Sequence, residues 1–191
     1  MNARVKLAVV VAVVSAVAVV TTVAVAGGGK KIREELTGYE ETPLALSTPG
    51  HATFKARVDK HGQRIDYRLS YADLESPVTQ SHIHFGAEAQ SGGISVFLCS
   101  NLGNGPAGTQ ACPPQPATIS GTIVPKDVIG PAAQGIDPGQ FGELVDAIRA
   151  GATYVNVHSE KYAGGEVRAQ LDEDDDDNHN HHRGGKHDRD R

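Results

Sequence analysis

Three histidines on two short alternating segments are the residues of this sequence best suited to chemistry. Residues 81–85 read SHIHF, with two imidazoles spaced by one residue, and residues 154–158 read YVNVH. In a β-strand, residues two apart point to the same face, so His82 and His84 share one face of their strand. If the two strands are neighbours, His158 joins them, and three imidazoles form a donor set suited to Zn or Cu.

Two further polar residues, Glu166 and Arg168, are predicted to share one face of a strand over 165–171. We interpret this pair, together with the histidines, as a structural polar cluster and not as catalytic machinery. The histidines also have a simpler interpretation, in which each imidazole hydrogen-bonds to a neighbouring carboxylate or carbonyl. The sequence has no G-x-S-x-G or H-E-x-x-H motif, so no catalytic residue is assigned and no enzyme activity is expected. Zn and Cu are the candidate cofactors.

The secondary-structure elements that must position these residues are predicted to be mainly β-strands. Apolar and polar residues alternate over 52–58 and again over 65–71, and the residues between these runs place Gly62 at a hairpin turn. Short runs of the same kind separated by Gly and Pro predict an antiparallel β-sandwich or barrel. The further predicted strands are 79–85, 94–99, 117–124, 153–158 and 165–171.

One segment has helical spacing instead. Phe141, Leu144, Val145 and Ile148 recur on one face, which predicts a short helix over about 138–150. Asp137 is its expected N-cap, with Pro138 at the first helical position, and Gly151 is expected to end it in a left-handed conformation.

The two ends of the chain differ from its middle. Residues 1–26 carry two basic residues, a long apolar run and an A-x-A cleavage motif, which together predict a cleaved signal peptide. A retained membrane anchor is the alternative. Residues 27–33 are interpreted as a linker. Residues 172–191 hold eight acids and four histidines, and this composition predicts a disordered tail that is either solubilising or weakly chelating. The predicted location is therefore extracytoplasmic: secreted, or in the cell envelope or periplasm.

Location decides how the two cysteines are interpreted. In an oxidising compartment Cys99 and Cys112, which are separated by a Gly- and Pro-containing loop, are predicted to form a disulfide. The formal net charge of the 191 residues is -5 and no basic run is present, which excludes nucleic acid as a partner. The expected partner is an extracellular ligand of unknown identity, and a membrane only if the N-terminal segment is retained.

An ordered set of motifs resembles the chordin domain (CHRD) family. Residues 34–171 carry the resemblance, through LTGYEETP, SHIH, YVNVHS and GGEVRAQL at residues 36–43, 81–84, 154–159 and 164–171. The resemblance implies an extracellular all-β domain of the kind found singly in exported bacterial proteins and as repeats in the animal growth-factor antagonist chordin. It implies no catalytic activity.

These observations predict an exported, non-enzymatic binding or cell-surface module. The alternative is a metal-binding protein, or a metalloenzyme similar to Cu/Zn superoxide dismutase, that uses the three-histidine cluster. That enzyme needs additional ligands, including a bridging histidine and an aspartate for zinc. The middle of the chain, residues 27–171, has five histidines in total.

Overall fold

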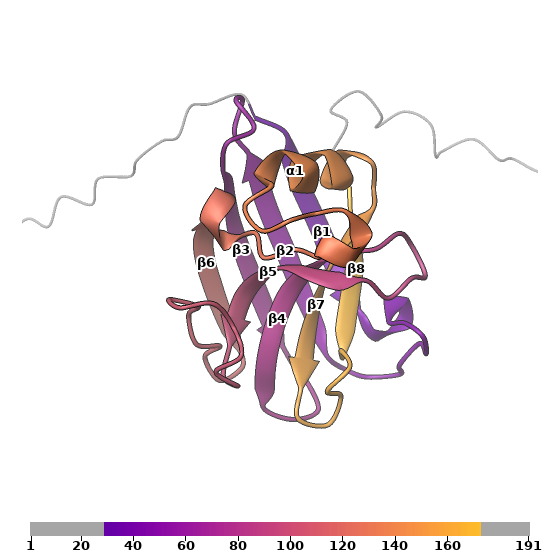
Figure 1. Ribbon diagram of the computed structural model, residues 1–191. Coiled ribbons are helices and arrows are strands. Elements are labelled where there is room, and N and C mark those ends of the chain that lie inside the picture. Colours follow the sequence, from indigo (N-terminus) through magenta and orange to yellow (C-terminus); the bar gives the residue numbers. More distant parts are fainter. Residues whose placement is uncertain (1–28, 173–191) are drawn as a thin grey trace, which may run out of the picture.

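In the computed structural model, which describes residues 29–172, eight antiparallel strands form a nearly closed barrel (Figure 1). The strand order is β5-β4-β7-β8-β1-β2-β3-β6. The mainly β architecture predicted from the alternation is therefore confirmed. The strands are β1 (Lys31–Thr37), β2 (His51–Val58), β3 (Ile65–Ala72), β4 (Val78–Phe85), β5 (Gly93–Ser100), β6 (Ala117–Ile123), β7 (Thr153–Ser159) and β8 (Val167–Leu171).

The β2–β3 hairpin forms as predicted, and Gly62 in its turn has a φ of +62°. Strand β1 was not predicted, and it begins at Lys31, within the segment 27–33 that we interpreted as a linker. Ile32 explains why the strand starts so early, because its side chain is buried and it pairs with Ala56 of β2. Burial of this one apolar residue extends the sheet into a charged segment whose alternation is weak.

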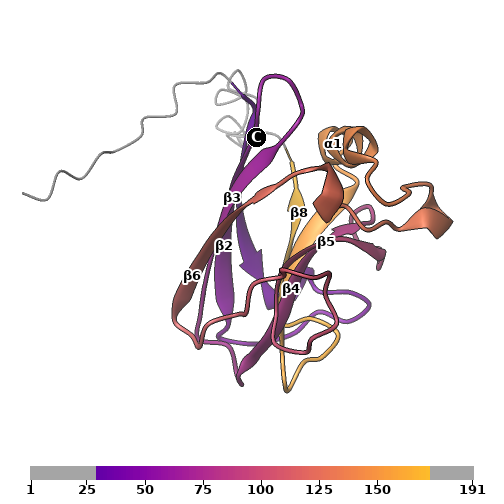
Figure 2. The same ribbon diagram turned by 60° about the vertical axis from the view of Figure 1, so that its left-hand side comes forward.

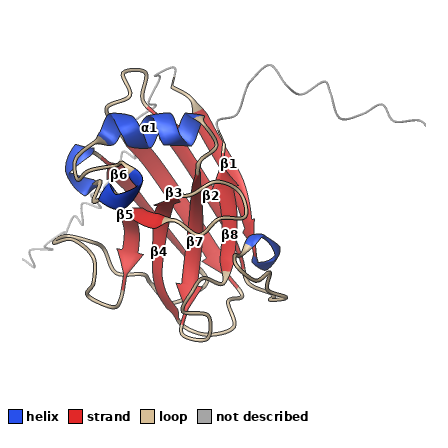
Figure 3. Ribbon diagram, turned by 45° about the vertical axis from the view of Figure 1, so that its right-hand side comes forward, coloured by secondary structure: helices blue, strands red, loops and turns tan. Residues whose placement is uncertain are grey.

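One α-helix, α1 (Phe141–Arg149), lies at the upper end of the barrel in Figure 1, and Figure 3 shows it in blue above the strands. It begins three residues later than predicted because Gly139 has a φ of +87°, which is incompatible with a helix. Gly151, with a φ of +61°, follows the helix as predicted. Three short 3-10 helices complete the elements of the described part of the chain: η1 (Gly38–Glu40), η2 (Pro125–Asp127) and η3 (Ala132–Gln134). Among residues 29–172 no helix is long and apolar enough to span a membrane.

The apolar core is shared by the strands and α1. The predicted apolar face of β4 and β7 contributes Ile83, Val155 and Val157, which are all buried, while Phe85 is partly buried at its edge. The apolar stripe of α1, including Leu144, packs into the same core. Because successive residues of a strand alternate between faces, the polar residues between these apolar ones lie on the outer face of the barrel wall.

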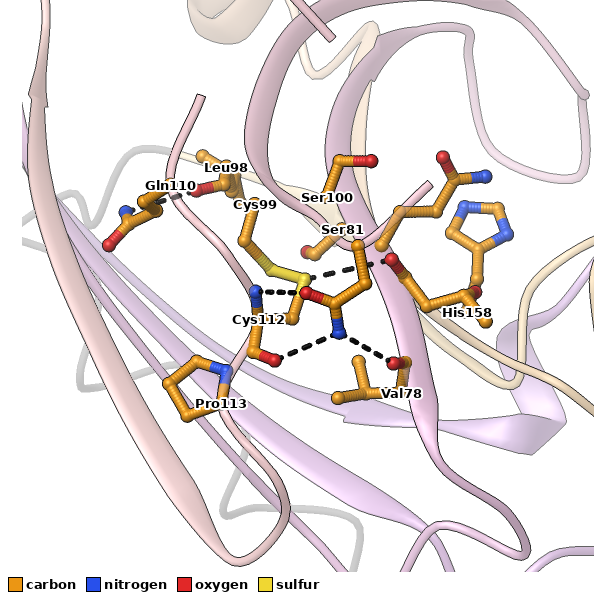
Figure 4. The surroundings of a disulfide bond; sticks show 12 residues. Val78, Ser81, Leu98, Cys99, Ser100, Gln110, Cys112, Pro113 and His158 are labelled. Carbon is orange, nitrogen blue, oxygen red and sulfur yellow. Dashed lines mark hydrogen bonds between the residues drawn. A yellow bond between two sulfur atoms is a disulfide. The ribbon is translucent and has the colours of Figure 1, made fainter. Parts of the chain in front are cut away.

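The barrel does not close between its edge strands β5 and β6, and the loop between these strands bridges part of the gap (Figure 2). The Gln110 amide donates to the Leu98 carbonyl of β5 at 3.0 Å and to the Ser120 carbonyl of β6 at 3.4 Å. Cys99 and Cys112 form the predicted disulfide, with Cα atoms 5.1 Å apart, and so fasten this loop to β5 (Figure 4).

The predicted signal peptide or anchor, residues 1–26, lies outside the described residues, and so does the predicted tail after Asp172.

Candidate metal centre

Pairing of β4 with β7 brings the three predicted histidines together. The register places His82 opposite Asn156 and His84 opposite Tyr154, and it places His158 opposite Gln80. One ring nitrogen from each of the three imidazoles lies within 4.8 Å of the others. The cluster lies on the face of β4 and β7 that points away from the apolar core.

The spacing of the rings is close to that of a metal site. His82 Nδ1 and His158 Nε2 are 3.2 Å apart, and the ring centres of His82 and His84 are 5.3 Å apart. A metal–nitrogen distance of about 2.0 Å in tetrahedral geometry puts ligand nitrogens about 3.3 Å from one another. The His82–His158 pair already has this spacing, which is that of an N–H···N hydrogen bond between the two rings. An ion would take the place of the proton on His82 Nδ1, which would move to Nε2 of the same ring, and His84 would supply the third nitrogen.

Backbone carbonyls fix which nitrogen of two rings carries the proton. His84 Nδ1 donates to the Gly92 carbonyl and His158 Nδ1 donates to the Ala163 carbonyl, each at 3.0 Å. Because a carbonyl oxygen only accepts, the neutral rings of both residues have their lone pair on Nε2. This is the arrangement by which outer hydrogen bonds orient metal-binding histidines. The Nε2 atoms of His82 and His84 are buried and have no hydrogen-bond partner.

Burial keeps the cluster neutral. Desolvation is the main cause that lowers the pKa of His82 to about 2, and the nearby His158 and His84 lower it in the same direction. Desolvation likewise lowers the pKa of His158 to about 4, and it is the main cause of a lowered pKa at His84. All three imidazoles are therefore uncharged at neutral pH, which is the protonation state that a metal ligand requires.

Loops and aromatic rings enclose the cluster on the outside of the barrel. The exposed fractions of His82, His84 and His158 are 1%, 8% and 5%. The Phe97 ring of β5 meets the His82 ring edge to face, with centres 4.4 Å apart. The Tyr154 ring stacks on the His84 ring with centres 4.7 Å apart and planes within 3° of parallel. The histidines are thus shielded from solvent by aromatic neighbours.

Arg168 is connected to the cluster through Tyr154. Its guanidinium carbon lies 3.6 Å from the centre of the Tyr154 ring, and because β7 lies between β4 and β8, this ring is sandwiched between Arg168 and His84. Arg168 also donates to the hydroxyl of Thr42 and to the Ala87 carbonyl, so it holds two of the covering loops. Burial raises the pKa of Glu41, which interacts electrostatically with Arg168, to about 7.

Glu166 belongs to a separate network. Its buried carboxylate accepts hydrogen bonds from the Thr48 hydroxyl at 2.6 Å, the Glu75 backbone N–H at 2.8 Å and the Ser159 hydroxyl at 2.5 Å. The predicted polar cluster therefore divides in two. Arg168 lies beside the histidines, whereas Glu166 ties the loop before β2 to the ends of β7 and β8.

Sequence reasoning did not single out Asn156, Tyr154 or Phe97. Asn156 belongs to β7, pairs with His82 across to β4, and its side-chain amide lies 3.0 Å from His158 Nε2. Tyr154 and Asn156 lie four and two residues before His158, so all three point to the same face of the strand. This spacing could have identified both residues from the sequence. No signal for Phe97 existed before the pairing of β5 with β4 was known.

The fold and the cluster together define a small antiparallel barrel domain that carries a buried set of potential metal ligands on its outer face. The profile of the CHRD domain matches residues 32–171, so the chain belongs to the CHRD domain family. This confirms the resemblance and its extent. No curated protein and no solved structure matches the chain.

Proposed function

We propose that this CHRD domain chain is a non-enzymatic binding module that works outside the cytoplasm and holds one transition-metal ion, Cu or Zn. The ligands are His82, His84 and His158. The observation that carries the proposal is the convergence of three neutral imidazoles, one of which, His84, has its Nε2 buried without a partner. A buried lone pair without a partner costs about 1–3 kcal/mol, and a bound ion would recover that loss.

Binding is favoured over turnover by the enclosure of the cluster. The three histidines are almost fully buried beneath loops that Arg168 and the Gly92 and Ala163 carbonyls help to hold. A substrate would have to displace those loops to reach the ion. The extracytoplasmic location is supported by the signal-like composition of residues 1–26 and by the disulfide, since disulfides persist mainly in oxidising compartments.

The test is metal binding by the purified full chain at neutral pH. The four histidines of residues 172–191 are replaced with Ala so that they do not contribute ligands. We expect one Cu or Zn per chain by elemental analysis, and we expect that His84→Ala abolishes this stoichiometric binding. His61→Ala is the matched control, because His61 is exposed in the β2–β3 turn and should leave the stoichiometry unchanged.

Three results would overturn the proposal. Binding of neither metal, or equal binding by His84→Ala, would leave the cluster structural. Superoxide turnover by the copper-loaded chain that His84→Ala abolishes would replace the binding module with an enzyme.

A further inference from the structure

The ligand set of the cluster is electrically neutral. Within residues 29–172 the group of potential ligands consists of three imidazoles, without a carboxylate or thiolate, and the two cysteines are bonded to each other. The adjacent Asn156 adds only an uncharged side-chain amide, which lies 3.0 Å from His158 Nε2. Because no ligand neutralises it, a bound ion would keep its full charge inside the site.

The surroundings of the three histidines disfavour a bound ion of high charge. The histidines are enclosed, and the Arg168 guanidinium lies on the far face of the Tyr154 ring that stacks on His84. Glu41 offsets the charge of Arg168 only in part, because its burial favours the protonated form. The cost of burying an ion grows with the square of its charge, so a divalent ion costs about four times as much as a monovalent one of equal radius.

The number of ligands points in the same direction. Zn(II) in closed sites takes four ligands, and a water molecule in the fourth position needs both space and polar partners. The cluster presents three nitrogens, and one side of it is closed by the apolar edge-to-face contact between Phe97 and His82. Both ions have a filled d shell, but Cu(I) is stable with three nitrogen ligands in a plane, whereas Zn(II) prefers four ligands.

From these three observations we propose that the ion is copper in its monovalent state, Cu(I), held by His82, His84 and His158. The inference rests on the metal-binding function proposed above. It adds the oxidation state and a selectivity: neutral ligands and an enclosed, partly apolar setting favour Cu(I) over Zn(II).

The experiment compares the two ions on the full chain with its C-terminal histidines replaced by Ala, under anaerobic conditions at pH 7. Cu(I) is supplied in competition with bathocuproine disulfonate, and Zn(II) in competition with a chromogenic zinc chelator. We expect one Cu(I) per chain, with an apparent Kd at least about tenfold lower than the Kd for Zn(II).

A single substitution changes the feature on which the selectivity depends. Asn156→Asp places a carboxylate where the side-chain amide now lies, which supplies both a fourth ligand and a negative charge. We expect the preference for Cu(I) over Zn(II) to shrink by about tenfold or more. Asn104→Asp is the matched control, since it adds the same charge at an exposed loop position and should leave the ratio unchanged.

The outcomes separate the two proposals. Tighter binding of Zn(II) than of Cu(I) by the parent chain, or an unchanged ratio in folded Asn156→Asp, would overturn the assignment of Cu(I) while leaving metal binding intact. Binding of neither ion would overturn both. If Asn156→Asp does not fold, the ratio measured on the parent chain decides the question alone.

Discussion

Acidification should destabilise the metal-free protein through its three-histidine cluster. Burial lowers the pKa of His82 to about 2 and of His158 to about 4, whereas histidine in an unfolded chain titrates near 6.5. Between these values the unfolded chain binds more protons than the folded chain, so stability falls as the pH falls. The stabilising effect of the neutral rings is thus fully present above pH 6.5 and is lost progressively below it.

The magnitude follows from the pKa differences. One pKa unit corresponds to about 1.4 kcal/mol, so lowering the pH from 7 to 5 should cost about 2 kcal/mol for each of His82 and His158. His84 adds a loss of the same sign. Glu41 acts in the opposite direction, because a carboxyl whose pKa is raised to about 7 gains stability on protonation, by about 2 kcal/mol over the same interval. The net loss in the unmodified protein is therefore about 2 kcal/mol or slightly more.

Glu41→Gln separates the opposing contributions. With this titration removed, the loss of unfolding free energy between pH 7 and pH 5 should grow to about 4 kcal/mol. Urea unfolding followed by circular dichroism, with a chelator present, measures both proteins at both pH values. His61→Ala in the Glu41→Gln background should leave the loss unchanged. A loss below about 1 kcal/mol in Glu41→Gln would refute the burial argument for the cluster.

Four other predictions concern the free energy of unfolding, measured by urea titration at pH 7. Replacing both Cys99 and Cys112 with Ala opens a loop with a sequence separation of 13 and should cost about 3 kcal/mol; no change would mean that the loop is held without the disulfide. Glu166→Gln should cost about 2 kcal/mol because three donors lose a buried carboxylate, and stabilisation would contradict this. Leu144→Ala should cost about 2–5 kcal/mol by leaving a cavity beneath α1, and a loss under about 1 kcal/mol would show that α1 does not contribute to the core. A chain that ends at Leu171 should unfold within about 0.5 kcal/mol of the full chain, and a larger loss would show that the tail docks.

The alternation of residues between the two faces of a strand was the feature of the sequence that predicted the site. The alternation in residues 81–85 and 154–158 placed the three histidines on one face, and the pairing of β4 with β7 made them neighbours. The β2–β3 hairpin was predictable for a similar reason, because Gly62 marks its turn between two regular runs. These features depend on residues close together in the sequence, where periodicity carries information.

Contacts between distant segments were not predictable. The alternation places Arg168 of β8 and Glu166, which directly precedes β8, on one face, but the loops that approach that face give each residue a different set of partners. The burial of the histidines likewise depends on loops whose paths have no periodic signal. At α1, the sequence pattern resembled a helix from Pro138, and only the left-handed backbone of Gly139 delayed its start.

The bridge that Gln110 makes between β5 and β6 bears on how the molecules behave at high concentration. A sheet edge with unpaired backbone groups is a template on which a strand from another molecule can pair, and this barrel has two such edges side by side. The Gln110 amide occupies a carbonyl on each edge, and the nearby disulfide keeps its loop in place. Reduction of that disulfide would leave the loop held to β5 by hydrogen bonds alone, such as that from Ser100 N–H to the Gln110 carbonyl. The two edges would then be less well protected, and intermolecular strand pairing, with aggregation as its result, would become easier.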